Sequence, residues 1–356
     1  MKRTFSLICI ACAVCALLAP VSLAAGRGGG GLGGRGKNPN QKPDQPSTSG
    51  DEGMTPLPPA VRKTAEEEAG RGKIVETERT MEDGEAVYDV TIRGLIFEHT
   101  VTIAPDGTLL SRQVFTWKLP AAVKRTVTSL ERHGQIGDIY LTFEDGDASY
   151  AVEIQQVAGK RFFTVALDGT HEATQMHMNE IPAAVQKAIL AQAAGGNVFN
   201  IDRSEVDGGK IFNVLMIQGG KRRTVSIDTD GAVVGTQVYL PEIPAQCQMG
   251  ITKQAAGAKI IYIERSIEEG QLQFDVTTIH NGTKREFTVG KDGKLLSTVV
   301  PLSEVPESVK TAIREKTTGG RITRVDKLAD EPSYEVEVER DGKKRTVSVS
   351  ADGKLE

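Results

Sequence analysis

The chain has 356 residues, of which 39% are hydrophobic, 25% charged and 5% aromatic. Single hydrophobic cores seldom grow beyond roughly 250 to 300 residues, so this length predicts two or more globular domains, and the composition excludes collagen-like and multi-span membrane proteins. Lys and Arg number 43 against 47 Asp and Glu, which gives a net charge of −4. Proteins that bind the phosphate backbone of nucleic acids usually carry an excess of positive charge, so we expect no nucleic acid partner.

The first 24 residues have the order of a secretory signal peptide. Lys2 and Arg3 precede an apolar run from Phe5 to Leu18, and small residues surround Ala24. We predict a signal peptide over residues 1–24 with cleavage after Ala24, and hence a secreted or periplasmic protein. The apolar run is shorter than the roughly 20 residues that span a bilayer, so no integral membrane span is expected after cleavage. A retained anchor or a lipidated cysteine is the less favoured alternative.

Residues 25–56 are rich in Gly, Pro, Ser, Asn and Gln. Such a composition cannot bury enough apolar surface to order itself, so we predict a flexible tether. The glycine run of residues 26–36 contains only two arginines, Arg27 and Arg35, which disfavours an RNA-binding Arg-Gly-Gly segment. Cleavage of the leader would remove three of the four cysteines, and the remaining Cys247 could form no internal disulfide.

From residue 57 onward the sequence repeats itself. Each copy begins with an apolar residue and a proline, spaced by 62 residues: Leu57-Pro58, Leu119-Pro120, Ile181-Pro182, Ile243-Pro244 and Val305-Pro306. Asp-Gly pairs recur near the end of each copy, at Asp106, Asp168, Asp230, Asp292 and Asp352. We therefore predict five modules, at 57–118, 119–180, 181–242, 243–304 and 305–356. The fifth stops where its last strand would begin, so its sheet should carry an open edge.

Each module opens with a predicted helix. The proline suits the first helical position, because its φ is fixed and its missing N–H is not needed there. In the third module Val185, Ala188 and Ile189 have the i, i+3, i+4 spacing of an amphipathic helix. Small residues follow each helix, where an exit with positive φ is expected: Gly72, Gly134, Gly196, Ala258 and Gly320.

After each helix the hydrophobic period changes to two. Tyr88, Val90 and Ile92 alternate with polar residues, and an aromatic residue leads the corresponding run in every copy. This pattern predicts a half-buried antiparallel strand, joined by a hairpin to a strand that ends at Asp-Gly, with one further strand before and one after the pair. The expected fold class is α+β: five tandem repeats, each one helix packed on a four-stranded antiparallel meander sheet. Because a module of 62 residues has little interior, neighbouring copies should pack together or share a sheet.

The order Leu-Pro-x-Ala-Val, Gly, aromatic-x-Val, hairpin, Thr-Val and Asp-Gly resembles the PepSY domain, and in particular the PepSY-like modules grouped with the β-lactamase-inhibitor protein fold. The resemblance covers residues 57–356 in five copies. It implies an exported or envelope-associated protein without catalytic activity that binds or restrains peptidases. The β-lactamase inhibitor covers its enzyme with a concave sheet made by two such modules, but this chain lacks that inhibitor's disulfides.

No residue pattern predicts a catalytic, cofactor or metal site. The five histidines lack the helical i, i+4 pairing or the Cys-x-x-Cys partners of a zinc site. Turn geometry accounts for the repeated aspartates before glycine. Valine occupies the place of Cys247 in the four other copies, so this thiol is expected to be buried and unreactive.

A cation recurs seven residues before the turn aspartate, and we predict these residues as partner-binding: Arg161, Arg223, Arg285 and Arg345, with His99 in the first copy. Strand parity places them at the margin of the inward face, where the stem can cover the core and the guanidinium can reach a carboxylate or water. Two readings stay open. The arginines either form ion pairs within their modules or make a row of basic patches that docks an acidic partner.

The sequence thus predicts an exported, non-catalytic protein-binding array that restrains or inhibits a secreted peptidase and needs no cofactor. Repetition favours avidity over a single deep pocket. The alternative is a structural or scaffolding protein of the cell envelope, with the modules as spacers.

Overall fold

The computed structural model describes residues 54–354, apart from 83–84, 145–146, 158, 207, 269, 281–282, 317–319, 331–332 and 341–342. The predicted signal peptide, its cleavage site at Ala24 and nearly all of the predicted tether lie outside the described residues. The described chain forms two compact parts, which divide between Leu109 and Leu110.

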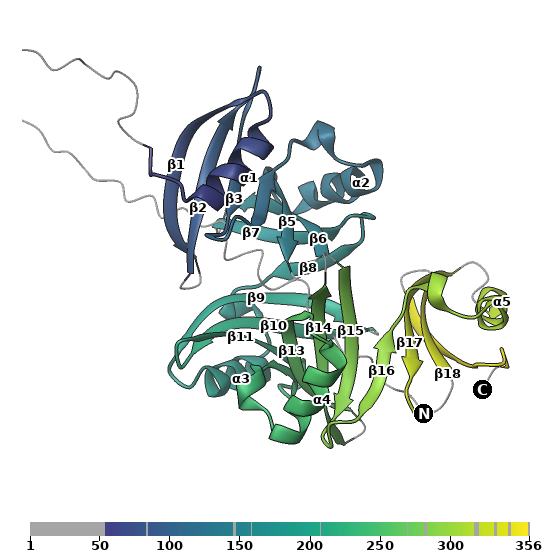
Figure 1. The fold of residues 1–356 in the computed structure, drawn as a ribbon. Helices are drawn as coiled ribbons and strands as arrows, with labels where there is room; N and C mark the ends of the chain where they lie inside the picture. The colour runs from purple at the N-terminus through teal and green to yellow at the C-terminus, as the bar shows by residue number, and fades with distance from the viewer. Residues whose placement is uncertain are drawn as a thin grey trace, which may run out of the picture. The chain divides into compact units, whose positions relative to one another are not determined.

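The architecture is α+β, with repeated units of one helix followed by antiparallel strands, as the sequence predicts (Figure 1). The helices in the described part of the chain are α1 (Pro59–Ala69), α2 (Ala121–Leu130), α3 (Ala183–Ala193), α4 (Ala245–Ala255) and α5 (Glu307–Lys316). At ten or eleven residues, each of these helices is too short to cross a bilayer.

Each helix is followed by a meander of strands. The first strands are β1 (Lys73–Glu82), β5 (Gln135–Glu144), β9 (Asn197–Val206), β13 (Lys259–Glu268) and β17 (Arg321–Leu328). The second strands are β2 (Glu85–Arg93), β6 (Asp147–Gln156), β10 (Gly209–Gln218), β14 (Gln271–His280) and β18 (Ser333–Arg340). The third strands are β3 (Glu98–Ile103), β7 (Gly159–Ala166), β11 (Lys221–Asp228), β15 (Thr283–Gly290) and β19 (Lys343–Ser350). The fourth strands are β4 (Leu109–Gln113), β8 (His171–Gln175), β12 (Val233–Gln237) and β16 (Leu295–Val299).

The opening prolines lie one position earlier than predicted. Pro58, Pro120, Pro182 and Pro244 are N-cap residues with extended ψ of 141° to 151°, and the helices begin at the next residue. The carbonyl of Pro58 accepts the first helical hydrogen bond from the N–H of Arg62 (2.9 Å). An N-cap residue needs a non-helical backbone and an accepting carbonyl but no N–H, and proline meets these requirements.

The predicted positive φ after the helix occurs at Gly134, whose φ is 154°, but not at Gly72, Gly196 or Ala258. The left-handed turn occurs earlier, for example at Ala194 with a φ of 46°. A Cβ atom on Gly196 would lie 2.2 Å from the carbonyl oxygen of Ile217 on β10. Glycine is therefore needed here because two backbone segments approach closely.

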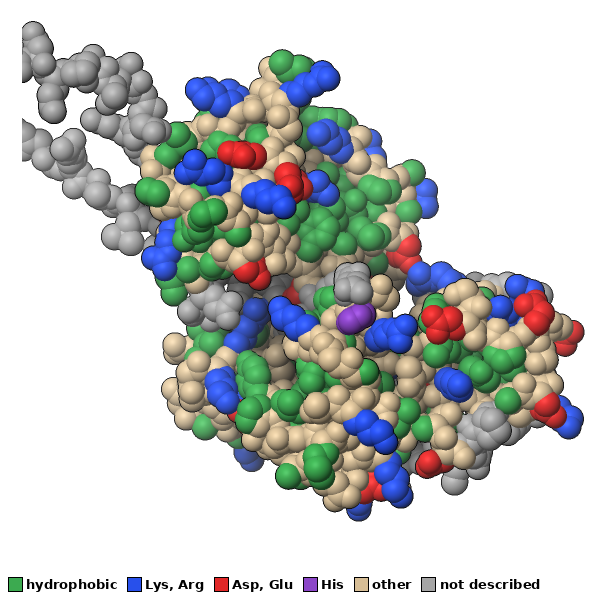
Figure 2. Space-filling view, viewed as in Figure 1, with side chains coloured by type: hydrophobic (Ala, Val, Ile, Leu, Met, Phe, Trp, Pro, Cys, Tyr) green, Lys and Arg blue, Asp and Glu red, His purple; other side chains and the backbone are tan. Residues whose placement is uncertain are grey.

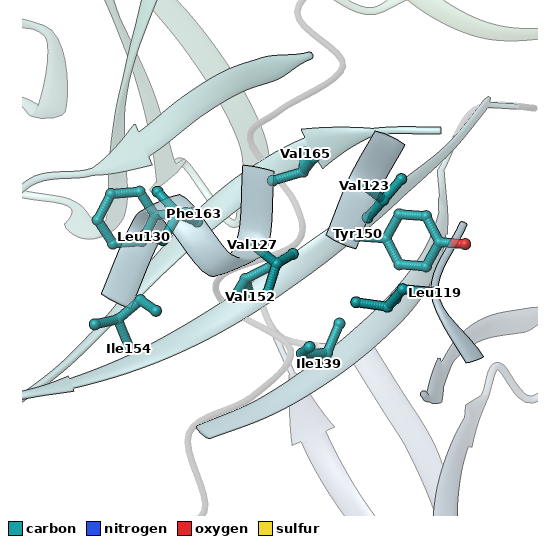
Figure 3. Packing of buried hydrophobic residues seen from close by; sticks show 10 residues of the cluster. All are labelled: Leu119, Val123, Val127, Leu130, Ile139, Tyr150, Val152, Ile154, Phe163 and Val165. Atoms are coloured by element: carbon teal, nitrogen blue, oxygen red, sulfur yellow. The ribbon is translucent and has the colours of Figure 1, made fainter. Parts of the chain in front are cut away.

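One hydrophobic core lies between the helix and the strands of each module. In the second module, Val123, Val127 and Leu130 of α2 face Tyr150 and Val152 of β6 (Figure 3). The aromatic residues predicted to lead the inward faces are at most 8% exposed: Tyr88, Tyr150, Phe212, Phe274 and Tyr334. Each apolar side chain buried in this way contributes about 1.5 to 3 kcal/mol to folding.

The Asp-Gly turns pack on the first turn of the helix in their own module. A Cβ atom on Gly231 would lie 2.7 Å from the carbonyl oxygen of Ala184 in α3, and one on Gly293 would lie 2.4 Å from that of Gln246 in α4. Both glycines also have positive φ, 85° and 78°. The turn therefore requires glycine for its backbone conformation and for close contact with the helix, and this explains why Asp-Gly recurs at the same distance from the proline in the first four modules.

The modules within residues 110–354 share one continuous sheet. The fourth strand of a module pairs antiparallel with the first strand of the next, at β4–β5, β8–β9, β12–β13 and β16–β17. Three residue pairs join the strands at each junction. The expectation that neighbouring copies share a sheet is confirmed.

The predicted half-buried character of the central strands is wrong for the second to fourth modules. The second face of the sheet, which is the face directed away from the helix, is also buried there. Ala151, Leu215 and Thr277 are 0% exposed, and Glu153 is 6% exposed. Polar side chains on this face bond to one another; Asp275 accepts from the hydroxyls of Ser266 and Thr288, for example. The alternation of apolar and polar residues along a strand predicts which residues face the helix, but it does not predict whether the second face is covered.

Candidate protein-binding surfaces

The structure assigns two of the four predicted arginines to ion pairs within their modules. Arg161 on β7 donates to Glu180, and Arg223 on β11 donates to Glu242 at 2.8 Å. These glutamates end the short 3-10 turns that lead into the next helix, η4 (Met178–Glu180) and η5 (Leu240–Glu242). The arginine side chains are only 15% and 16% exposed. Each of these ion pairs therefore links the third strand of its module to the segment that leads into the following module.

The ion pair between Arg223 and Glu242 in the third module is part of a larger cluster of interacting side chains. Glu242 also accepts from Lys221 at 2.7 Å, and the guanidinium of Arg223 lies 5.6 Å from the ring centroid of Tyr239. The Arg223 guanidinium, followed by Lys221 and the Tyr239 N–H, lowers the pKa of Glu242 to about 2, while partial burial opposes this shift. Burial raises the pKa of the Tyr239 hydroxyl, which donates to the carbonyl of Arg222.

The corresponding residues of the fourth module, Arg285 and Glu304, do not form an ion pair with each other. Arg285 and Glu304 are both exposed, and neither forms an ion pair with a described residue. Arg345 in the fifth module is also exposed. Of the four predicted residues, two are therefore half-buried in ion pairs and two project from their modules. Whether any of them binds a partner stays a prediction.

His133, His171 and Cys247 contact neighbouring groups of their own modules. His133 and His171 flank the ring of Phe163 at centroid distances of 5.4 and 5.8 Å, and burial is the largest cause that lowers the pKa of His171. No three His, Cys, Asp or Glu side chains among the described residues are grouped so that they could hold a metal ion. The Cys247 side chain is 0% exposed, as predicted, and its thiol lies 3.2 Å from the carbonyl oxygen of Lys291.

Sequence reasoning missed a buried charge cluster on the second face of the sheet. Arg324 on β17 forms a two-pronged ion pair with Asp326 on the same strand, at 2.7 and 3.0 Å, and donates to Glu286 on β15 at 2.7 Å. Lys284 lies 2.9 Å from the other oxygen of Glu286. Burial alone would disfavour these charges, and the two carboxylates reverse its effect by raising the pKa of Arg324. The cluster ties the fourth module to the fifth across β16.

Sequence reasoning also missed an apolar hairpin tip in the first module. Leu95, Ile96 and Phe97 connect β2 to β3 and are 104%, 81% and 49% exposed. The corresponding turn in the third module contains Gly219 and Gly220. Three consecutive apolar residues in a turn, where another copy has glycines, were the signal available in the sequence.

The basic residues do not form one continuous patch on the face drawn in Figure 2. Lys and Arg side chains are scattered there between hydrophobic and acidic ones. Single exposed apolar residues, such as Val157 and Met249, are ordinary on a protein surface. The hairpin tip differs from them because three apolar side chains are adjacent.

The chain is similar to several solved structures of Bacteroides proteins. One is a DUF2874 family protein from Bacteroides ovatus, which is 16% identical, covers 36% of this chain and 92% of its own, and has a TM-score of 0.28. Another is a BLIP-like protein from Bacteroides fragilis, at 14% identity, 33% and 84% coverage and a TM-score of 0.26. A third, from Bacteroides eggerthii, is named as a candidate periplasmic protein and shows 17% identity, 33% and 86% coverage and a TM-score of 0.27.

No family model and no curated protein sequence matches the chain. The architecture given above rests on the strand pairings and cores of this chain itself.

Proposed function

We propose that the protein is an exported, non-catalytic array of five modules, at 57–118, 119–180, 181–242, 243–304 and 305–356, that binds a secreted peptidase and restrains it. The observation that carries this proposal is the hairpin tip of Leu95, Ile96 and Phe97. Exposed adjacent apolar side chains cost solubility and mark sites where a partner covers them.

The second faces of the modules support a role for the first module in particular. In the second to fourth modules these faces are buried and cannot meet a partner without unfolding. In the first module Glu76 and Glu78 of β1 are exposed on this face, and Thr91 of β2 is half-buried. The hairpin tip and the exposed Glu76 and Glu78 thus belong to the same module, which suits it to contact a protein surface.

The experiment measures inhibition of a panel of purified exported peptidases by the full-length protein. We expect stoichiometric inhibition of at least one enzyme, weakened at least about tenfold in a Leu95→Asp/Phe97→Asp variant, because a charged tip cannot enter an apolar site. Val157→Asp is the matched control, since Val157 is 110% exposed in the corresponding hairpin of the second module. Both variants should keep the melting temperature of the wild type, because exposed substitutions change stability by at most about 0.5 kcal/mol.

Two outcomes would contradict the proposal. If no peptidase is inhibited while the array binds isolated envelope fractions, the scaffolding role is favoured. If an enzyme is inhibited equally by wild type and the tip variant, the binding surface lies elsewhere. Arg285, one of the two exposed members of the predicted arginine row, is the next residue to test, by Arg285→Glu.

A further inference from the structure

The junction between the third and fourth modules contains a wedge-shaped pocket. Strands β12 and β13 are joined by three residue pairs, and the last of these is Gly235 with Ser266. Beyond that pair each strand continues to pair only with its other neighbour, β11 or β14, so the two strands diverge. Between Val234 and Ile267 the divergence leaves a pocket of about 390 Å³, a volume within the range of ligand sites.

The walls of this pocket are mostly apolar. Val233, Ile267 and Leu272 line it, and Ile267 is 69% exposed although it is a large aliphatic side chain in a strand. Gln192 of α3, Arg265 of β13, Thr236 and Ser266 supply polar groups. The pocket therefore offers an apolar site next to one cation, one amide and two hydroxyls.

Arg265 is available to bind an anion. Its side chain is exposed and forms no ion pair with any residue that the structure describes. A guanidinium presents two parallel N–H groups that match the two oxygens of a carboxylate, and such charge-assisted bonds are about twice as strong as neutral ones.

The neighbouring junctions lack this combination. At the preceding junction Arg203 corresponds to Arg265, but Glu205 and Lys210 stand in the places of Ile267 and Leu272. At the following junction the N–H of Ala329 donates to the carbonyl of Leu296 at 2.9 Å, which closes the strands one residue further along. An apolar wedge beside a cation therefore occurs at β12–β13 and at neither of these two junctions.

We propose that this pocket binds the carboxyl terminus of an extended peptide that ends in an aliphatic residue. The aliphatic side chain fills the space between Val233 and Leu272, and the terminal carboxylate binds the guanidinium of Arg265. The peptide backbone lies between the diverging strands, whose edges do not pair with each other there. The site is separate from the hairpin tip and does not depend on the proposed function.

The test uses fluorescence anisotropy with full-length protein and a labelled peptide, Ser-Thr-Val-Val-Leu, with a free carboxyl terminus. We expect saturable binding by the wild type, at least about tenfold weaker binding of the same peptide as its C-terminal amide, and a similar loss in Arg265→Gln. Arg203→Gln is the matched control and should bind like the wild type. The amide comparison uses wild-type protein alone, so it does not depend on how any variant folds.

Three results would overturn the proposal: no binding below about 1 mM, equal binding of the acid and the amide, or an equal loss in Arg203→Gln. Displacement of the peptide by decanoate at the same affinity would assign the pocket to fatty acids instead. Inhibition of a peptidase, as tested for the hairpin tip, is measured without this peptide, so the two proposals can fail independently.

Discussion

The central strands of the first and third modules share one sequence pattern but differ in how deeply their second faces are buried. Strand β2 and strand β10 both direct an aromatic and two further apolar residues at their helix, and these are buried in each case. On the other face Thr91 of β2 is half-buried, whereas its counterpart Leu215 of β10 is 0% exposed. The shared alternation encodes the core of the module, and the burial of the second face depends on what the rest of the fold places against it.

The largest expected effect tests this contrast directly. Leu215→Glu places an unpaired carboxylate on the buried second face of β10 and should destabilise the protein by about 3 kcal/mol or more. Thr91→Glu, at the equivalent position of β2, should cost less than about 1 kcal/mol, because Thr91 is only half-buried and a carboxylate there can reach water. Urea unfolding of the full-length variants measures both. Equal losses would mean that the two faces do not differ in solution.

A second comparison concerns the junction ion pairs. Glu242→Gln removes the carboxylate that holds Arg223 and Lys221 and should cost about 1 to 2 kcal/mol, whereas Glu304→Gln, its exposed counterpart, should cost less than about 0.5 kcal/mol. The folded-state pKa of Glu242, about 2, lies below its ordinary value of 4.5. Its contribution is therefore complete above the ordinary value and disappears as the pH falls towards 2.

Thermal unfolding of wild type and Glu242→Gln from pH 6 to pH 2 checks this sign. The two melting temperatures should converge on acidification. A difference that stays constant over that range would show that the carboxylate charge does not contribute and that Glu242 acts only through its shape.

The smallest effect is expected at Cys247. Cys247→Val restores the residue found in the other four modules and should change stability by less than about 1 kcal/mol. Burial raises the pKa of this thiol, so a thiol-specific reagent should modify it slowly in the native protein and quickly in urea. Rapid native labelling would mean that the helix α4 opens readily.

The sequence predicts the repeated unit well because period and turn chemistry are local. Pro58 and its counterparts, the alternation at Tyr88 and the Asp-Gly pairs are each set by backbone geometry within one module. The positions of Gly72 and Gly196 were predicted for the wrong reason, since the approach of Ile217 depends on how a helix exit packs against a strand.

The candidate sites were less accessible to prediction. Parity placed Arg161 and Arg223 at the margin of the inward face, but their glutamate partners lie about 20 residues away along the chain, at Glu180 and Glu242. The pocket beside Arg265 depends on where two strands diverge, and no residue pattern encodes that point. Only the apolar turn at Leu95 could have been identified from the amino acids alone.

The three-residue pairings between modules also determine what happens when one of them opens. A module that unfolds transiently leaves the next strand of its neighbour with a bare row of N–H and C=O groups, which can recruit another chain. A mutation in one copy would therefore endanger the others by promoting aggregation at the exposed edge, even where their own cores are intact.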